Sequence, residues 1–215
     1  MTAPLSPSVP RLYGLLDFGY VAPEAAERVA AELLAGGIDL LQLRAKGRDP
    51  AELEPIARRL LPLCRAAGVP FIINDHPALA AAIDADGVHL GQDDGPLAPV
   101  RALLGPGKFV GRSTHSPDQA RAALAEGFDY IGFGPLFATP TKPGRPAIGL
   151  ADLAAVQAEV GSRIPVFAIG GIKRDNLATV RAAGARNVVI VSDLLTAPDV
   201  RFATLVAKRM LNVEC

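Results

Sequence analysis

The segment QLRAK places an amide and two cations at every second position, as Gln42, Arg44 and Lys46. Side chains at alternate positions of a β-strand point to the same face. Arginine and lysine donate charge-assisted hydrogen bonds to phosphate oxygens, so one face that carries all three side chains is suited to a polyphosphate. The alternative is a strand end that is merely solvated, and this segment alone does not decide between the two.

Carboxylates follow the next two apolar runs of the chain. PFIIND ends in Asn74 and Asp75, and the run that begins GVHLGQ leads to Asp94. Carboxylate oxygens are hard ligands that bind Mg2+, and Mg2+ bridges to phosphate oxygens. We therefore expect one Mg2+ ion at Asp75 and Asp94, unless each aspartate only caps the helix that follows it.

A proline-rich loop, GPLFATPTKPGRP, begins within the sixth apolar run. Thr139, Thr141 and Lys142 offer two hydroxyls and an ammonium almost side by side. Pro140 and Pro143 restrict the backbone, which should lower the entropy lost when the loop closes over a ligand. A rigid surface turn is the alternative interpretation of this loop.

A second anion site is expected where the seventh and eighth apolar runs end, at Gly171 and at Val191 and Ser192. Eight-stranded α/β barrels often bind phosphate between these two loops through backbone N–H groups. Ser113, at the end of the fifth run, is a candidate contact to a phosphate or a ring, whereas a lone histidine such as His115 is more often structural. A diphosphate site with Mg2+ beside a monophosphate site indicates group transfer with pyrophosphate as the leaving group.

Eight short apolar runs must position these residues. They are near-continuously apolar, as expected for strands buried on both faces of a parallel sheet, and amphipathic segments separate them. The series has no composition break, which predicts a single α/β domain over residues 11–215, a (β/α)8 TIM barrel. An open doubly wound sheet is the alternative, and it would leave the first and last strands unpaired. The runs are RLYGLL from Arg11, IDLLQLR from Ile38, PFIIND from Pro70, GVHLGQ from Gly87, FVGRSTH from Phe109, DYIGFGPL from Asp129, PVFAIGGI from Pro165 and NVVIVSDLL from Asn187.

Helical patterns with start or stop signals lie between these runs. Asp49 and Pro50 open one that stops at Gly68, and Ser116 opens another that stops at Gly127. Aspartate and serine cap helix N-termini, and glycine ends helices. The predicted helices cover residues 23–37, 49–68, 116–127, 175–184 and 197–212.

Composition limits the remaining classes of function. Basic and acidic residues balance at 22 each, so nothing indicates bulk attraction to nucleic acid or to an anionic membrane. Cys64 falls in a helical pattern and is expected to be buried, and the sparse cysteine usage fits a reducing cytoplasm. Residues 1–10 lack the pattern of a secretion signal, and their proline and serine content predicts a short flexible lead. The sequence does not decide whether the protein is a homo-oligomer.

The motifs together resemble those of the thiamine-phosphate synthase family. They are QLRAK, INDHPALAAAIDADGVHLGQDD, GRSTH, DYIGFGPLFATPTKPGR, PVFAIGGI and IVS, in that order. The resemblance covers the chain from about Arg11 to the last helix, and its motifs fall on six of the strand ends. It implies a (β/α)8 barrel that joins hydroxymethylpyrimidine diphosphate to a thiazole phosphate. Pyrophosphate leaves, thiamine monophosphate forms, and CO2 also leaves when the thiazole carries a carboxylate.

The resemblance also implies roles for individual residues. The pyrimidine diphosphate would be held by Gln42, Arg44, Lys46, Asn74, Ser113 and Lys142, and Mg2+ by Asp75 and Asp94. The thiazole phosphate would contact Thr139, Thr141, Gly171, Val191 and Ser192. The candidate catalytic residues are Arg44, Lys46, Ser113 and Lys142. A pyrimidine-methylene cation would form as pyrophosphate departs, so placement and neutralisation of charge are the main tasks.

One residue departs from the family pattern. Asp193 follows the serine of the eighth strand, where the family usually has a small residue. A carboxylate facing the phosphate would weaken binding, so we expect Asp193 to turn away and cap the final helix.

Three other functions are compatible with parts of the sequence. A thiazole tautomerase relative shares the barrel and the GRS-x-H strand, and there His115 would transfer protons; it resembles the synthase but lacks the metal ends and the T-x-T-K loop. A sugar-phosphate epimerase would use the strand-seven and strand-eight phosphate site without needing QLRAK. A non-catalytic phosphate-ligand sensor would not need the pair of aspartates.

Overall fold

Eight parallel strands close into a barrel in the computed structural model, which describes residues 11–139 and 146–212. Neighbouring strands pair in chain order, and the last strand pairs with the first through Leu12↔Val188 and Tyr13↔Val189. This closure confirms the predicted TIM barrel over the open sheet. The strands are β1 (Leu12–Asp17), β2 (Leu40–Arg44), β3 (Phe71–Asn74), β4 (Gly87–Leu90), β5 (Phe109–Thr114), β6 (Tyr130–Phe133), β7 (Val166–Ala168) and β8 (Asn187–Ile190).

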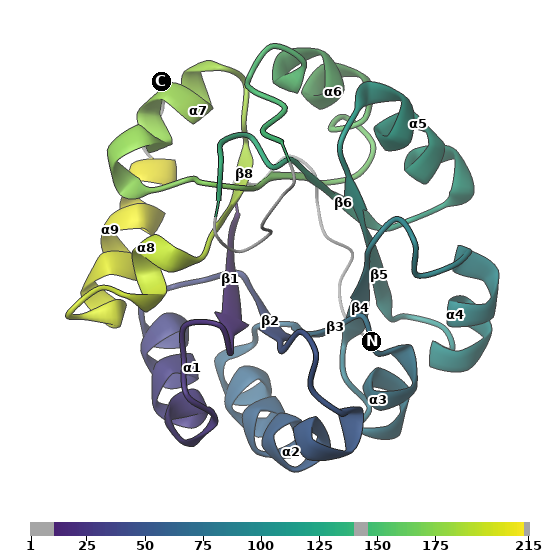
Figure 1. Ribbon diagram of the computed structural model, residues 1–215, viewed down its shortest axis with the longest axis vertical. Helices are drawn as coiled ribbons and strands as arrows, with labels where there is room; N and C mark the ends of the chain where they lie inside the picture. The colour runs from purple at the N-terminus through teal and green to yellow at the C-terminus, as the bar shows by residue number, and fades with distance from the viewer. Residues whose placement is uncertain (1–10, 140–145, 213–215) are drawn as a thin grey trace.

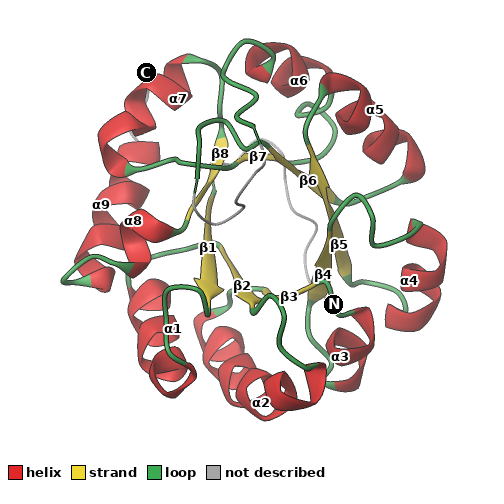
Figure 2. Ribbon diagram, viewed as in Figure 1, coloured by secondary structure: helices red, strands yellow, loops and turns green. Residues whose placement is uncertain are grey.

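Helices surround the barrel as an outer ring, which the view along the barrel shows clearly (Figures 1 and 2). The α-helices are α1 (Ala26–Ala35), α2 (Pro50–Ala67), α3 (Pro77–Ala82), α4 (Leu97–Leu104), α5 (Pro117–Glu126), α6 (Leu153–Glu159), α7 (Leu177–Ala182), α8 (Ser192–Leu195) and α9 (Val200–Asn212). Short 3-10 turns, η1 (Pro23–Ala25) and η2 (Arg174–Asn176), precede α1 and α7. Within the described ranges no helix has the length and apolar character needed to cross a membrane.

The predicted helix signals act as capping chemistry requires. Asp49 accepts a hydrogen bond from the Ala51 N–H, and Ser116 accepts one from the Gln119 N–H. Gly68 follows α2 in the left-handed conformation, where a side chain would be strained. Local chemistry therefore fixed the starts and stops of α2 and α5.

Several predicted boundaries are wrong. The eighth apolar run does not continue as a strand, because Ser192–Leu195 turns into α8. The helix expected over residues 23–37 opens with the 3-10 turn η1, and α3, α4 and α6 were not among the predicted helices. Short helices have too few turns to show a clear apolar period, and apolarity alone does not separate a strand from a buried helix.

Aromatic side chains fill the centre of the barrel. The ring of Tyr13 packs edge-on against Tyr130 and Phe167, with ring centroids 5.9 and 5.1 Å apart. Tyr130 and Phe167 also meet edge-on at 5.6 Å. All three are fully or almost fully buried, so the aromatic cluster closes the barrel below its mouth.

Candidate functional site

Three pockets open at the carboxyl ends of the strands, and Ser113 lines all of them. We name them by their walls. The aromatic pocket is lined by Tyr13, Gln42, His89, Tyr130 and Phe167, and the acidic pocket by Arg44, Lys46, Asp75, Asp93 and Asp94. The glycine pocket is lined by Gly132, Gly134, Thr139, Gly170, Gly171 and Ser192. Shared lining residues make the three pockets parts of one mouth.

Gln42 and Arg44 face into the barrel, as the alternation along β2 predicts. Both are buried, so they are not the solvent-exposed strand end that was the alternative interpretation. Gln42 is 3% exposed and Arg44 is 8% exposed. The Arg44 guanidinium donates to the Asp17 carboxylate at the end of β1, with Nη1 and Oδ2 2.5 Å apart. Asp17 also accepts the Gly19 N–H, so a buried carboxylate orients Arg44 toward the mouth.

The acidic pocket gathers Lys46 and the two aspartates predicted to bind metal. The Lys46 ammonium pairs with the Asp75 carboxylate, while Asp94 Oδ2 accepts the Gly91 N–H at 2.6 Å. The residues that precede α3 and α4 at the N-cap position are His76 and Pro96, so neither aspartate acts only as a helix cap. Asp75 also adopts a left-handed backbone conformation, with φ of 64°.

The carboxylate oxygens that line the acidic pocket would fit a Mg2+ ion whose remaining ligands come from a bound small molecule. Across residues 11–139 and 146–212 no cluster of three or more histidine, cysteine, aspartate or glutamate side chains is arranged to hold a metal. Mg2+ commonly uses one or two carboxylates and completes its shell with substrate phosphates and water. Asp75 and Asp94 line the same pocket, so their carboxylates are a donor pair that would fit Mg2+ completed by water or by a ligand.

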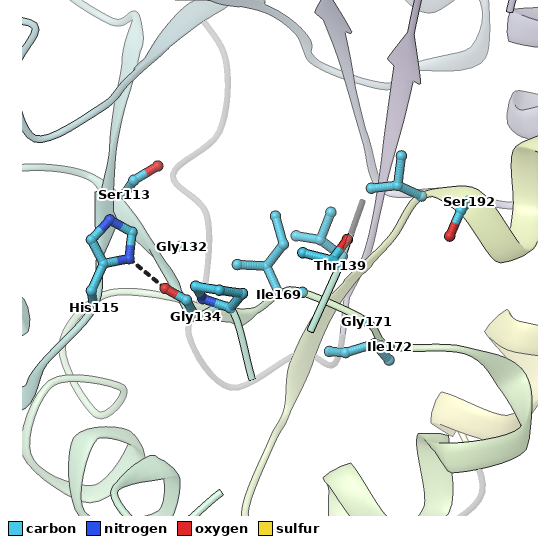
Figure 3. Close-up of a pocket in the computed structure, with 13 residues that line it drawn as sticks. Ser113, His115, Gly132, Gly134, Thr139, Ile169, Gly171, Ile172 and Ser192 are labelled. Atoms are coloured by element: carbon cyan, nitrogen blue, oxygen red, sulfur yellow. Dashed lines mark hydrogen bonds between the residues drawn. The ribbon is translucent and has the colours of Figure 1, made fainter. Parts of the chain in front are cut away.

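In the glycine pocket a ligand could approach the backbone closely, because glycine has no side chain. Figure 3 shows Ser113 and His115 on one side of it, with Thr139 and Ser192 on the opposite side. Gly171 has φ of +66°, and a Cβ added there would lie 2.6 Å from the Phe137 Cβ. Val191 and Ser192 complete the wall at the end of β8, so Thr139, Gly171, Val191 and Ser192 come together as predicted. Thr141, Lys142 and the two prolines beside them lie outside the described residues.

Asp193 turns away from the glycine pocket, but it does not cap the final helix. Its carboxylate accepts hydrogen bonds from the Arg174 backbone N–H at 3.0 Å and from Arg174 Nε at 2.8 Å. Asp199 occupies the capping role at α9, because its side chain accepts the Phe202 N–H. Partial burial works to raise the pKa of Asp193, and the hydrogen bonds from Arg174 outweigh it and hold the pKa below its ordinary value.

The sequence profile of the family described as thiamine monophosphate synthase matches residues 12–194. The chain belongs to this family. The match spans every strand of the barrel and reaches into α8, so it includes the strand ends that form all three pockets.

Individual relatives agree with the family assignment. A thiamine-phosphate synthase of Thermus thermophilus is 49% identical over 181 residues, which cover 84% of this chain and 86% of the relative. A thiamine-phosphate synthase of Chloroflexus aurantiacus is 41% identical, and the match covers 94% of this chain and 93% of the relative. The solved thiamine phosphate pyrophosphorylase of Pyrococcus furiosus aligns with a TM-score of 0.83 at 33% identity, covering 94% of this chain and 95% of that one.

Some side chains at the mouth of this family member were not singled out from the sequence. They are Tyr13, Asp17, His89 and Tyr130, for none of which the sequence predicts a role in the site. The alternation of side chains along β1 could have indicated two of them, because Tyr13 and Asp17 are an even number of residues apart and point to the same, inward face. Burial raises the pKa of Tyr13 and of Tyr130, so both phenols keep their protons at neutral pH.

Proposed function

We propose that this protein is a thiamine-phosphate synthase that joins hydroxymethylpyrimidine diphosphate to thiazole phosphate, or to its carboxylate. The observation that carries the proposal is the convergence of two pockets with unlike linings on Ser113. One pocket has cations and carboxylates, as a metal-bound diphosphate needs, and the other has glycines and hydroxyls, as a monophosphate needs. The family match supports the same assignment.

The reaction requires the breaking of one bond and the formation of another. The methylene–oxygen bond of the pyrimidine diphosphate breaks, and its electron pair leaves with pyrophosphate. The thiazole nitrogen then donates its lone pair to the methylene carbon, so no base has to remove a proton from the nucleophile. With the carboxylated thiazole, CO2 leaves, the electrons of the carbon–carboxylate bond remain with the thiazole, and the thiazole takes up one proton from solvent.

The protein's task is to place two ligands and to stabilise the departing charge. We assign Arg44, Lys46, Ser113 and Lys142 to donate to diphosphate oxygens, and Gln42 and Asn74 to hold the same ligand. Asp75 and Asp94 would hold Mg2+, which neutralises phosphate charge when bound. Thr139, Thr141, Gly171, Val191 and Ser192 are assigned to the thiazole phosphate.

The site of action and the assembly state follow as further parts of the proposal. We place the protein in the cytoplasm, because the cysteine usage fits a reducing compartment. Burial raises the pKa of Cys64 to about 12, so its thiol is unreactive inside α2. A homo-oligomer is compatible with the proposal.

The test is a reconstitution with both substrates. The purified protein, incubated with hydroxymethylpyrimidine diphosphate, thiazole phosphate and Mg2+, should release thiamine monophosphate and pyrophosphate in equal amounts. Omitting either substrate should abolish product, and chelation with EDTA should abolish it until Mg2+ is restored. Absence of product while both substrates bind would contradict the proposal, and full activity in EDTA would contradict the metal assignment.

A further inference from the structure

Five polar side chains form a continuous hydrogen-bonded chain inside the barrel. Gln42 Nε2 donates to the Tyr13 hydroxyl at 2.6 Å, and the hydroxyls of Tyr13 and Tyr130 are 3.0 Å apart. The Tyr130 hydroxyl lies 3.2 Å from His89 Nδ1, and His89 Nε2 lies 3.0 Å from Ser113 Oγ. The chain begins and ends at residues assigned to the pyrimidine diphosphate, and its three middle members have no such assignment.

Gln42 donates at one end, and only one direction of the later bonds gives the buried Tyr13 proton an acceptor among these five side chains. Because Gln42 donates to Tyr13, the Tyr13 proton is available for Tyr130, and the Tyr130 proton is then available for His89 Nδ1. His89 must then carry its proton on Nε2, since each imidazole nitrogen either donates or accepts. Nε2 donates to Ser113 Oγ, so the Ser113 hydroxyl accepts within the barrel and keeps its own proton for another partner.

We infer that Tyr13, Tyr130 and His89 are positioning residues that hold Ser113 as a hydrogen-bond donor toward the bound pyrimidine diphosphate. This inference rests on the proposed function for the identity of the ligand. A ligand atom that faces Ser113 must then be an acceptor, such as a diphosphate oxygen.

Burial keeps the chain in one arrangement. Tyr13 is 2% exposed, Tyr130 is 0% exposed and His89 is 9% exposed, so water has little access to reverse the bonds. Burial raises the pKa of both phenols, which keeps both protons in place.

A glycine makes room for two members of this chain. A Cβ added at Gly111 would lie 2.1 Å from Tyr130 Cζ and 2.6 Å from His89 Nδ1. The edge-on contacts of Tyr130 with Tyr13 and Phe167 hold the phenol from the other side. The packing thus fixes the positions of the hydroxyl and the imidazole as well as their hydrogen bonds.

The direction of the chain is tested by nitrogen NMR on protein with isotope-labelled histidines. The three histidine signals can be assigned by comparison with His76→Gln and His115→Gln. His89 should show a protonated Nε2 and an unprotonated Nδ1, and Tyr130→Phe should shift it toward a mixture of tautomers. A protonated Nδ1 in the wild type would overturn the inference, and this measurement does not depend on enzymatic activity.

The consequence for catalysis is tested with a double-mutant cycle. Tyr130→Phe should lower kcat about tenfold in the wild type, about the effect of one neutral hydrogen bond. It should change kcat less than about twofold in a Ser113→Ala background, because the residue that it positions is already absent. Equal losses in both backgrounds would show that Tyr130 supports the fold rather than Ser113, and would overturn the inference.

The third tyrosine of the protein, Tyr20, is not one of these five hydrogen-bonded side chains and provides a matched control. Tyr20 lies after β1 and lines none of the three pockets, so Tyr20→Phe should leave kcat within about twofold of wild type. A loss at Tyr20 as large as that at Tyr130 would remove the specificity that the inference requires.

Discussion

At the scale of single residues, the ion pair between Asp17 and Arg44 links stability to the site. Both side chains are nearly excluded from solvent, with Asp17 1% and Arg44 8% exposed. A buried charge that loses its partner is costly, because desolvation is no longer offset. Asp17 therefore makes it feasible to keep a guanidinium inside the mouth before any phosphate is bound.

Asp17→Asn should lower the free energy of unfolding by about 3 kcal/mol, because it leaves Arg44 buried without a counterion. Urea denaturation measures this change. Pyrophosphate with Mg2+ should raise the melting temperature of Asp17→Asn more than that of wild type, since the anion supplies the missing charge. The control is Glu32→Gln, which removes the exposed pair with Arg28 on α1 and should cost about 0.5 kcal/mol or less. Equal losses in the two variants would contradict the role of Asp17.

Lys46 and Mg2+ compete for Asp75 in the proposed site. Lys46→Ala should bind Mn2+, used as a probe for Mg2+, about threefold more tightly, because Asp75 is released from an exposed ion pair. The same variant should bind metal–pyrophosphate about tenfold more weakly, because a charge-assisted hydrogen bond is lost. Isothermal titration calorimetry measures both affinities.

Lys108→Ala is the control for Lys46→Ala. Lys108 pairs with Asp84, which lies outside all three pockets, so both affinities should remain unchanged in this variant. Changes of the same sign in the two affinities of Lys46→Ala would show that Lys46 does not exchange between the carboxylate and the diphosphate.

At the scale of elements, the loop after β7 carries the glycine pocket. Gly171→Ala should disrupt binding of the thiazole phosphate, because the new Cβ would lie 2.6 Å from Phe137 and 3.0 Å from the Ala138 carbonyl oxygen. Gly68→Ala is closely matched, because Gly68 has φ of +67° against +66° at Gly171 and has nothing within 4 Å of an added Cβ.

Both glycine variants introduce backbone strain, but only Gly171→Ala also places a Cβ against neighbouring atoms. Comparing the two variants therefore separates the effect of strain from the effect of lost space. Gly68→Ala should cost about 1 kcal/mol of stability and leave the KM for thiazole phosphate unchanged. Gly171→Ala should cost more and raise that KM about tenfold or more, with pyrimidine diphosphate binding retained. Steady-state kinetics and denaturation measure both effects, and an unchanged KM in Gly171→Ala would remove Gly171 from the phosphate site.

The contact between α8 and η2 should be sensitive to acid. The pKa of Asp193 is held below its ordinary value of 3.8, so the paired carboxylate stabilises the fold at any pH above that value. Asp193→Asn should lower the free energy of unfolding by about 1 kcal/mol at neutral pH. The difference in free energy of unfolding between Asp193→Asn and wild type should decrease as the pH falls below 3.8, the ordinary pKa of the carboxyl group. It should disappear below the pKa that Asp193 has in the folded protein. Urea titrations from neutral to acid pH measure it, and a difference that grows in acid would reverse the assigned sign.

At the scale of the whole molecule, barrel closure brings the mouth together. β1 pairs with both β2 and β8, so Tyr13 and Asp17 lie beside residues from distant parts of the chain. Parallel pairing also places every strand's carboxyl end at the same rim, which is why strand-end residues meet. The structure therefore unites Arg44, Asp75, Ser113 and Thr139 around one opening.

The amino-acid sequence by itself determined the barrel, and it predicted that the candidate residues lie at the strand ends, where those that the structure describes line the three pockets. Apolar runs in series predict parallel strands, and polar residues at their ends predict the mouth, because both signals are local and repeat along the chain. Family motifs added the expected roles of the same residues. The boundaries of α8 and of the short helices were not predictable, since a few apolar residues fit a strand or a helix equally well.

Only the tertiary structure decided which side chains hold the site residues in place. Tyr13 and Tyr130 are 117 positions apart, and Asp17 and Arg44 are 27 apart, so no local pattern marks either pair. The pairing of Asp193 with Arg174, rather than with the final helix, likewise depends on how α8 packs against η2. Hydrogen-bond direction and burial arise from three-dimensional contacts, and the sequence specifies them only through the completed fold.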